Sequence, residues 1–192
     1  NKLVKISDKI SNYSVEEIKE FILKNSILSQ EDFFTEICFK VEKLKQEIED
    51  NRRSDKLTFY NENAQNKTPK IEERCRDIIL QRLESSYSNI YDFTKERYEG
   101  ENRVDINIRY LKDLSFEVQI ECKRDDNDNL YIGIENQLIK KYFSSGVNYG
   151  LYIIFYFGIK KNKKLMLEKV KKSLPSGFEN KIKIYCIDLT IE

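Results

Sequence analysis

The stretch Phe116–Lys123, which reads FEVQIECK, decides the fold that we expect for this chain. Its apolar and polar residues alternate with the period of two that is typical of a half-buried strand. Residues 104–108, which read VDINI, alternate in the same way. The connection between the two segments, residues 109–115, is short, so we expect them to pair as antiparallel strands.

In the sequence, one helix is expected before this strand pair and another after it. Thr68 and Pro69 predict a helix start, because they place an N-cap residue before a proline at the first helical position. After the second strand, a polar turn leads to a helix over residues 134–142, which Gly146 closes.

The last part of the chain adds two strands and a helix. Residues 151–157, which read LYIIFYF, are continuously apolar, as in a central strand covered on both faces. A lysine-rich helix to about Leu174 and a strand over residues 182–189 follow. From Thr68 the order is helix, strand, strand, helix, strand, helix, strand, which predicts an α/β fold with a mixed central β-sheet flanked by helices.

The N-terminal part has a different pattern. Ser14 and Ser29 each begin a capping-box pattern that leads into apolar residues at helical spacing. Residues 51–67 are polar and rich in Asn, as in a linker or loop. We therefore divide the chain into a helical region with its linker, residues 1–66, and an α/β domain, residues 67–192. The apolar faces of the first helices fit packing on that domain, a dimer contact, or the tail of a preceding domain.

Composition excludes several classes of protein. Lys and Arg number 34 against 33 Asp and Glu, so a net charge of +1 identifies no partner. No stretch approaches the roughly 20 apolar residues of a membrane span, so we expect no membrane partner. The four cysteines form no C-x-x-C pair, which indicates reduced thiols in a cytoplasmic protein. Because the chain begins with Asn1 rather than Met, we expect it to be either a trimmed chain or a domain of a longer protein.

The sequence contains no histidine. This excludes Ser-His-Asp and Cys-His catalysis, histidine-dependent nucleases and His-ligated zinc enzymes. Any acid–base or metal chemistry must therefore come from Asp, Glu, Lys and Tyr.

Three polar residues of the strand pair are candidates for such chemistry. Glu121 and Lys123 are two residues apart, so they point to the same face of their strand. Asp105 lies on the polar face of the preceding strand and can share that face if the pair is antiparallel. Magnesium favours such carboxylates, and a lysine beside it can orient or deprotonate a water because a metal and partial burial lower its pKa. The alternative is a solvated strand face, which opposite charges at this spacing also suit.

The following helix adds Gln137 and Lys141 on one face. Four segments follow one another along the chain: Val104-Asp105-Ile106, Ile120-Glu121-Cys122-Lys123, this helix, and the apolar strand at 150–157. In that order they resemble the PD-(D/E)XK superfamily of restriction-endonuclease-like nucleases. The proline usually found before the Asp is Val104 here. The resemblance covers about Thr68 to Leu189 and implies a restriction-endonuclease-like core.

The resemblance also implies roles for these residues. Mg²⁺, or Mn²⁺ in its place, would be bound by Asp105, Glu121, the Cys122 carbonyl and a Glu of the preceding helix, which here is Glu72 (or Glu73). Lys123 would serve the nucleophilic water, and Gln137 and Lys141 would hold the nucleic-acid backbone. The implied function is that of a metal-dependent endonuclease, with DNA favoured over RNA as the substrate. It would be the effector domain of a larger bacterial defence or restriction protein. The alternatives are an RNA-cleaving nuclease toxin and a catalytically inactive module that binds nucleic acid or protein.

A basic stretch is the remaining candidate for nucleic-acid binding. Its first four lysines, which we expect to track the backbone of the nucleic acid, are Lys160, Lys161, Lys163 and Lys164. The alternative is a solvated helix that balances the acidic N-terminal half. Besides nucleic acid, we expect either a homodimer or attachment to further domains.

Overall fold

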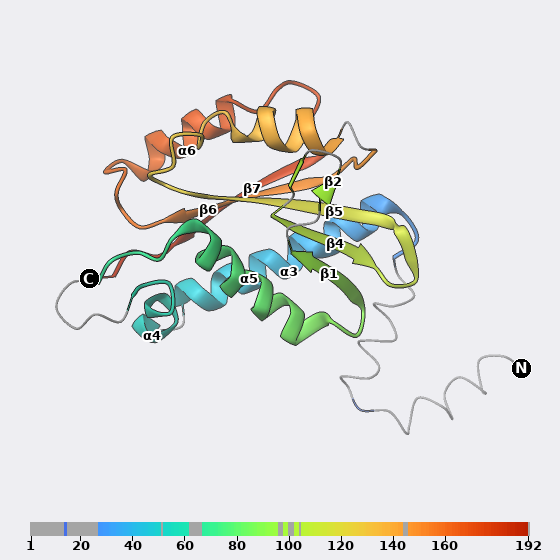
Figure 1. Cartoon of the computed structure of the whole chain (residues 1–192), viewed down its shortest axis with the longest axis horizontal. Helices are drawn as coiled ribbons and strands as arrows, with labels where there is room; N and C mark the ends of the chain where they lie inside the picture. The colour runs from blue at the N-terminus through green and yellow to red at the C-terminus, as the bar shows by residue number, and fades with distance from the viewer. Residues whose placement is uncertain are drawn as a thin grey trace, which may run out of the picture.

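The computed structural model describes residue 14 and residues 27–50, 52–61, 67–95, 98–99, 102–103, 105–143 and 146–191. Figure 1 shows the arrangement of its elements. The helices are α3 (Gln30–Asp50), α4 (Arg52–Leu57), α5 (Glu72–Tyr87), the π-helix η1 (Ile134–Tyr142) and α6 (Lys163–Lys172). The strands are β1 (Tyr91–Lys95), β2 (Tyr98–Glu99), β3 (Asn102–Arg103), β4 (Ile106–Tyr110), β5 (Asp113–Arg124), β6 (Gly150–Tyr156) and β7 (Ile182–Asp188).

Five strands form one mixed sheet in the order β1-β4-β5-β6-β7, while β2 and β3 form a separate hairpin. β1, β4 and β5 are antiparallel neighbours, and β5, β6 and β7 are parallel. The prediction of a mixed α/β sheet flanked by helices is confirmed. The predicted antiparallel strand pair is β4 and β5, with Ile106 opposite Ile120, and this register brings Asp105 beside Glu121.

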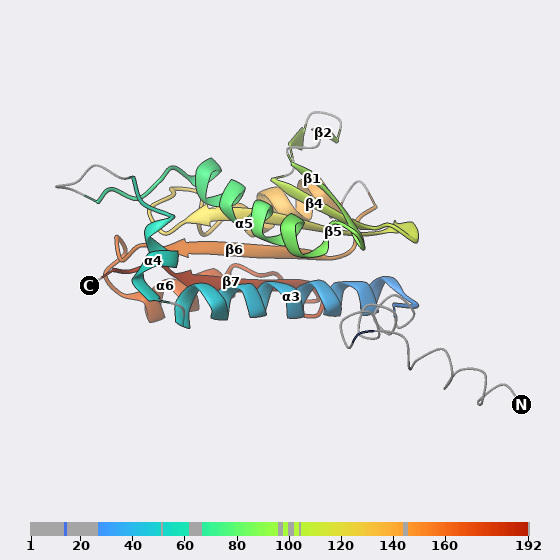
Figure 2. The ribbon, with the colours of Figure 1, turned by 90° about the horizontal axis from the view of Figure 1, so that it is seen from below.

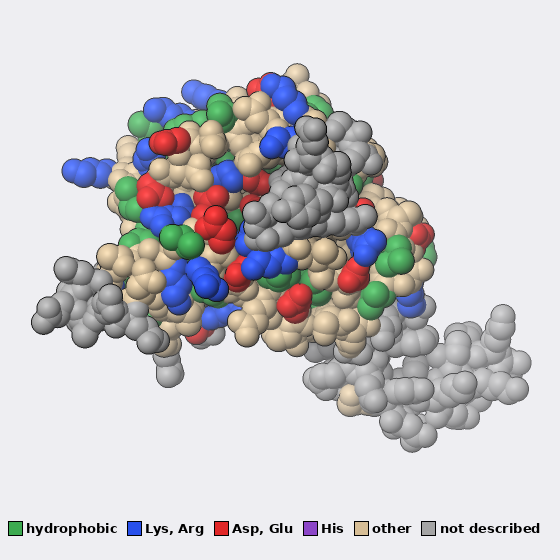
Figure 3. All heavy atoms as spheres, viewed as in Figure 1, with side chains coloured by type: hydrophobic (Ala, Val, Ile, Leu, Met, Phe, Trp, Pro, Cys, Tyr) green, Lys and Arg blue, Asp and Glu red, His purple; other side chains and the backbone are tan. Residues whose placement is uncertain are grey.

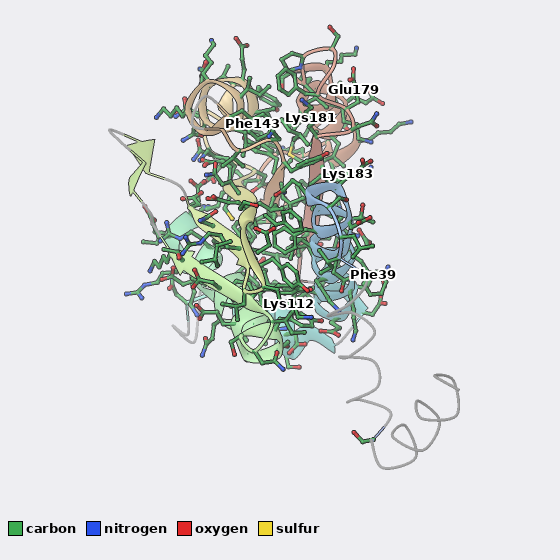
Figure 4. All side chains as sticks on the ribbon, turned by 90° about the vertical axis from the view of Figure 1, so that its right-hand side faces the viewer. Phe39, Lys112, Phe143, Glu179, Lys181 and Lys183 are labelled. Carbon is green, nitrogen blue, oxygen red and sulfur yellow. The ribbon has the colours of Figure 1, made fainter. Side chains whose placement is uncertain are left out.

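Helices cover both faces of the sheet. α3 and α5 lie on one face, and η1 and α6 on the other (Figures 1 and 2). Seen from the side, Phe143 at the end of η1 and Phe39 of α3 lie in different layers (Figure 4). Alternation along β6 divides the core between these layers: Ile153 packs with the α3 and α5 side, and Tyr152 and Ile154 pack with η1 and α6. Every residue of β6 is buried, as its continuous apolar run predicted.

Helix α3 begins where Ser29 predicted a helix start, since the Asp32 amide donates to the Ser29 hydroxyl at 3.1 Å. Of the three arrangements considered for the N-terminal helices, α3 shows packing on the sheet, against β5 and β7. The helix predicted after Ser14 lies outside the described residues, and the domain boundary at residue 66 stays a prediction. Within the part of the chain that the structure describes, no helix is long and apolar enough to cross a membrane.

Three local predictions were wrong. Part of the expected linker is the helix α4, and Phe59 after it is completely buried in the core. α5 begins at Glu72 rather than at Pro69, because Pro69 forms a bridge with Tyr60 and so belongs to an extended segment. β1 was missed, although its aromatic and polar residues alternate.

Candidate functional site

A cavity of about 310 Å³ opens where the start of α5, the start of β4, the second half of β5 and η1 meet. Acidic and basic side chains lie side by side on the face of the molecule between α5 and α6 (Figure 3). The cavity is lined by Glu72, Glu73, Arg76, Asp105, Glu121, Lys123, Gln137 and Lys141. The structure thus brings together the side chains predicted for catalysis and Lys141, although they come from distant parts of the sequence.

Glu121 and Lys123 form the buried centre of the site. Both point away from the apolar side chains of Ile120 and Cys122, as the strand alternation predicted. The Lys123 ammonium donates to Glu121 Oε1, to the Cys122 carbonyl at 3.1 Å and to Glu72 Oε1 at 3.4 Å. The solvated strand face considered as an alternative is therefore excluded, because both side chains are almost completely buried.

The pKa of Lys123 differs from the expectation. Burial acts to lower it, but the negative charges of Glu121 and Glu72 outweigh burial and raise the pKa above its ordinary value. The expected lowering depended on a bound metal as well as on burial, so it stays a prediction for the metal-bound site. Lys123 is a firmly protonated ammonium here, which suits it to hold a water or an anion in place rather than to remove a proton.

Asp105 lies directly before β4, with 20% of its side chain exposed. One carboxylate oxygen accepts the backbone amide of Cys122 at 2.9 Å, which ties the start of β4 to β5. The other oxygen accepts Arg76 Nη1 at 3.2 Å. Asp105 is therefore held by two donors and directed into the cavity.

Glu72 is the first residue of α5, where the helix dipole favours a negative charge. Its Oε2 accepts the Arg124 amide at 2.9 Å and the Asn127 side-chain amide at 2.8 Å. Its other oxygen faces Lys123, so this carboxylate links α5 to the end of β5. Glu73 also lines the cavity. The structure places both glutamates at the site and gives Glu72 the firmer position.

Gln137 and Lys141 reach the cavity from η1. The helix has π geometry: the Phe143 amide bonds to the Leu138 carbonyl five residues back. Such helices are rare and occur often at functional sites. The Gln137 Oε1 atom is buried, and among the described residues it has no hydrogen-bond partner. A buried acceptor without a donor costs free energy, so this oxygen is available for a bound water, cation or ligand.

Arg76 is the site residue that sequence analysis missed. It lies one turn after Glu72 on α5, and only 3% of its side chain is exposed. The available signal was its position, because it shares the buried face of α5 with Cys75, Ile79 and Leu83. A charged residue among apolar residues at helical spacing indicates a buried partner.

The basic stretch does not reach the cavity. Lys163 pairs with Asp188 at 2.6 Å, which makes it a structural residue of α6 and β7. Lys160, Lys161 and Lys164 are exposed. The Lys160 amide donates to Asp125 at the end of β5, so the loop that carries Lys160 and Lys161 lies beside the strand that carries the site.

The oxygen atoms that line the cavity are of a kind that binds a divalent cation. Their present positions, however, are not those of a formed metal site. The carboxylates of Glu72, Asp105 and Glu121 and the amide oxygen of Gln137 are hard oxygen ligands of the kind that Mg²⁺ and Mn²⁺ accept. However, among the described residues no three carboxylates or thiols are grouped as a metal site. The ammonium of Lys123 and the guanidinium of Arg76 lie against the carboxylate oxygens instead.

Comparison with known proteins identifies a matching family. A family described as a domain of unknown function, DUF8371, matches residues 32–159, from the first turn of α3 to just beyond β6. The matched region contains every residue that lines the cavity. No curated protein and no solved structure matches the chain. The match covers more than half of the chain, which therefore belongs to the DUF8371 family.

Proposed function

We propose that this protein is a metal-dependent endonuclease that hydrolyses phosphodiester bonds, with DNA rather than RNA as its substrate and Mg²⁺ or Mn²⁺ as its cofactor. The observation that carries the proposal is the single cavity that gathers Glu72, Asp105, Glu121, Lys123 and Gln137 from α5, β5, η1 and the position directly before β4. These are the residues that the resemblance to PD-(D/E)XK nucleases selected. The restriction-endonuclease-like identity of the core is part of this proposal.

The side chains have distinct tasks in the proposed reaction. Asp105, Glu121 and Glu72 would hold Mg²⁺, together with the Cys122 carbonyl. When bound, the metal supplies Lewis-acid polarisation of the phosphate and charge stabilisation at the leaving oxygen. Lys123 would orient the attacking water through its ammonium hydrogens.

Two further residues would position the substrate. Gln137 and Lys141 lie on η1 and face the same cavity, where an amide and an ammonium can donate to phosphate oxygens. Lys160 and Lys161, on the neighbouring loop, would contact the nucleic-acid backbone farther from the cut. A cytoplasmic location and a role as the effector domain of a larger bacterial defence or restriction protein belong to the same proposal. They rest on the resemblance and the sequence composition.

The test is cleavage of plasmid DNA, single-stranded DNA and tRNA by the purified protein with Mg²⁺ or Mn²⁺. We expect cleavage of DNA that is lost in Glu121→Gln and Lys123→Met but retained in Lys140→Met, whose lysine pairs with Glu135 on the surface. Cleavage of tRNA alone would reassign the substrate to RNA. Equal cleavage by wild type and the two cavity variants would exclude this site.

One observation favours a second candidate, a module with a nuclease-like site that binds without cutting. The cations Arg76 and Lys123 already neutralise Asp105 and Glu121, so the cluster is stable without a metal. Isothermal calorimetry with Mn²⁺ separates the two candidates. A nuclease site binds Mn²⁺ and loses that binding in Glu121→Gln, whereas a binding module gives no heat with either protein.

A further inference from the structure

The guanidinium of Arg76 lines the cavity and contacts the Asp105 carboxylate there. Its Nη1 donates to Asp105 at 3.2 Å, on the carboxylate oxygen that the Cys122 amide leaves free. The guanidinium therefore occupies the side of Asp105 on which a cation would bind. A divalent ion on Asp105 and the Nη1 contact compete for the same oxygen.

The rest of the guanidinium is held independently of Asp105. Its Nε and Nη2 donate to Asp77 Oδ1 at 3.4 and 3.3 Å. Asp77 is itself held by Lys95 of β1, whose ammonium donates to its other oxygen at 2.8 Å. Loss of the Asp105 contact would therefore leave Arg76 anchored by Asp77 beside the cavity.

The charges of the cavity explain why such a group is useful. Four carboxylates and three cationic side chains line it, so the described lining has a formal charge of −1 and no excess of positive charge for a phosphate. A divalent cation reverses that balance and also repels the guanidinium from Asp105. Guanidinium groups bind phosphate oxygens through directed, charge-assisted hydrogen bonds.

We propose that Arg76 is a phosphate-binding residue that exchanges its contact with Asp105 for the substrate phosphate when a divalent cation binds. The inference rests on the proposed function and extends it, because it couples cation binding to phosphate binding through one side chain. Asp77 is a positioning residue in this scheme. The coupling is reciprocal: the cation strengthens phosphate binding and the phosphate strengthens cation binding by the same factor.

The experiment measures that coupling without catalysis. A fluorescein-labelled DNA duplex is titrated with the protein in EDTA and in Ca²⁺, a cation of the same oxygen preference, and the affinity is read by fluorescence anisotropy. In wild type we expect Ca²⁺ to tighten DNA binding. In Arg76→Ala we expect DNA affinity in Ca²⁺ to fall about 10- to 100-fold, as for the loss of a charged hydrogen bond. Arg76→Lys should recover only part of the affinity, because an ammonium cannot keep both Asp77 and the phosphate.

A control on the same helix isolates the effect. Arg82 lies on α5 outside the cavity and pairs with Asp55 at 3.5 Å, so Arg82→Ala should leave DNA affinity unchanged. Calorimetry with Mn²⁺ and no DNA gives the second measurement. Removal of the competing guanidinium should leave Mn²⁺ affinity unchanged or increase it in Arg76→Ala.

The outcomes separate this inference from the proposed function. If Arg76→Ala weakens Mn²⁺ binding and leaves the DNA affinity of the Ca²⁺-loaded protein unchanged, Arg76 only supports Asp105 and the inference is overturned. That result would leave DNA cleavage by wild type intact. If wild type shows the coupling but cuts no nucleic acid, Arg76 keeps its role and the nuclease proposal fails. If wild type binds neither Mn²⁺ nor DNA, both fail.

Discussion

Replacement of Lys123 by Met should destabilise the protein strongly when no metal is present. The ammonium is the charged partner of Glu121 at the centre of the cavity and also contacts Glu72. Methionine keeps most of the aliphatic length of the side chain but removes the charge. The substitution therefore leaves two carboxylates without their cation while it changes the packing little.

The expected loss follows from burial. The side chains of Lys123 and Glu121 are only 6% and 2% exposed, so water can replace little of the lost interaction. Removal of one partner from a buried pair costs about 3–5 kcal/mol, because the other charge remains buried and uncompensated. In a protein of this size that corresponds to a fall in melting temperature of about 6–20 °C.

Urea unfolding in EDTA, followed by circular dichroism, measures this loss. Lys140→Met is the matched control, since Lys140 and Glu135 form the same kind of pair at 60% and 51% exposure and should contribute less than about 1 kcal/mol. Adding Glu121→Gln to Lys123→Met should restore much of the stability, because the buried charge is then gone. If Lys123→Met costs no more than Lys140→Met, the buried pair that we describe does not exist in solution.

Three further results are expected. Gly133→Ala should lower the free energy of unfolding by about 1–3 kcal/mol in urea titrations, since the new Cβ would lie 2.5 Å from the Tyr152 hydroxyl; an unchanged midpoint would contradict this packing. Burial raises the pKa of the Cys38 thiol from 9.0 to about 11, so at pH 8 the thiol should react with a disulfide reagent about 100-fold more slowly than in the unfolded chain. Its contribution to stability should fall as the pH rises above 9, because the unfolded chain then loses the proton first. Equal reaction rates in the folded and unfolded chains would refute the burial. Lys160→Ala with Lys161→Ala should reduce the salt dependence of DNA binding by a slope of about 2 without changing the urea midpoint; an unchanged slope would place the DNA elsewhere.

The arrangement around Lys123 has a consequence for how the site is recognised. In the absence of a metal, Asp105 and Glu121 are paired with protein cations, and Glu72 accepts a backbone amide. The cluster therefore differs from a group of carboxylates that face one another without cations between them. The buried Gln137 oxygen, which has no partner among the described residues, distinguishes the cluster from a completed salt-bridge network.

Local geometry explains what the sequence by itself determined. Alternation along β4 and β5 depends only on the pleat of a strand, so it placed Glu121 and Lys123 on one face and directed Cys122 into the core. The short connection between the two strands predicted that they pair antiparallel. The start of α3 at Ser29 depends on a hydrogen bond between residues three apart, and it was predicted for the same reason. The mixed sheet followed from the order of these local patterns.

Contacts between distant residues were decided only by the tertiary structure. The start of α5 moved to Glu72 because Pro69 pairs with Tyr60. Glu121, on the same strand, raises the pKa of Lys123 most, and the tertiary structure adds Glu72, which α5 places against the end of β5. The contact of Arg76 with Asp105 joins residues 29 positions apart and has no periodic signature in the sequence. Side-chain period reports which face a residue occupies, whereas the charge opposite it depends on how helices and strands pack. The sequence therefore selected most of the cavity residues, and the packing decided which of them neutralise one another.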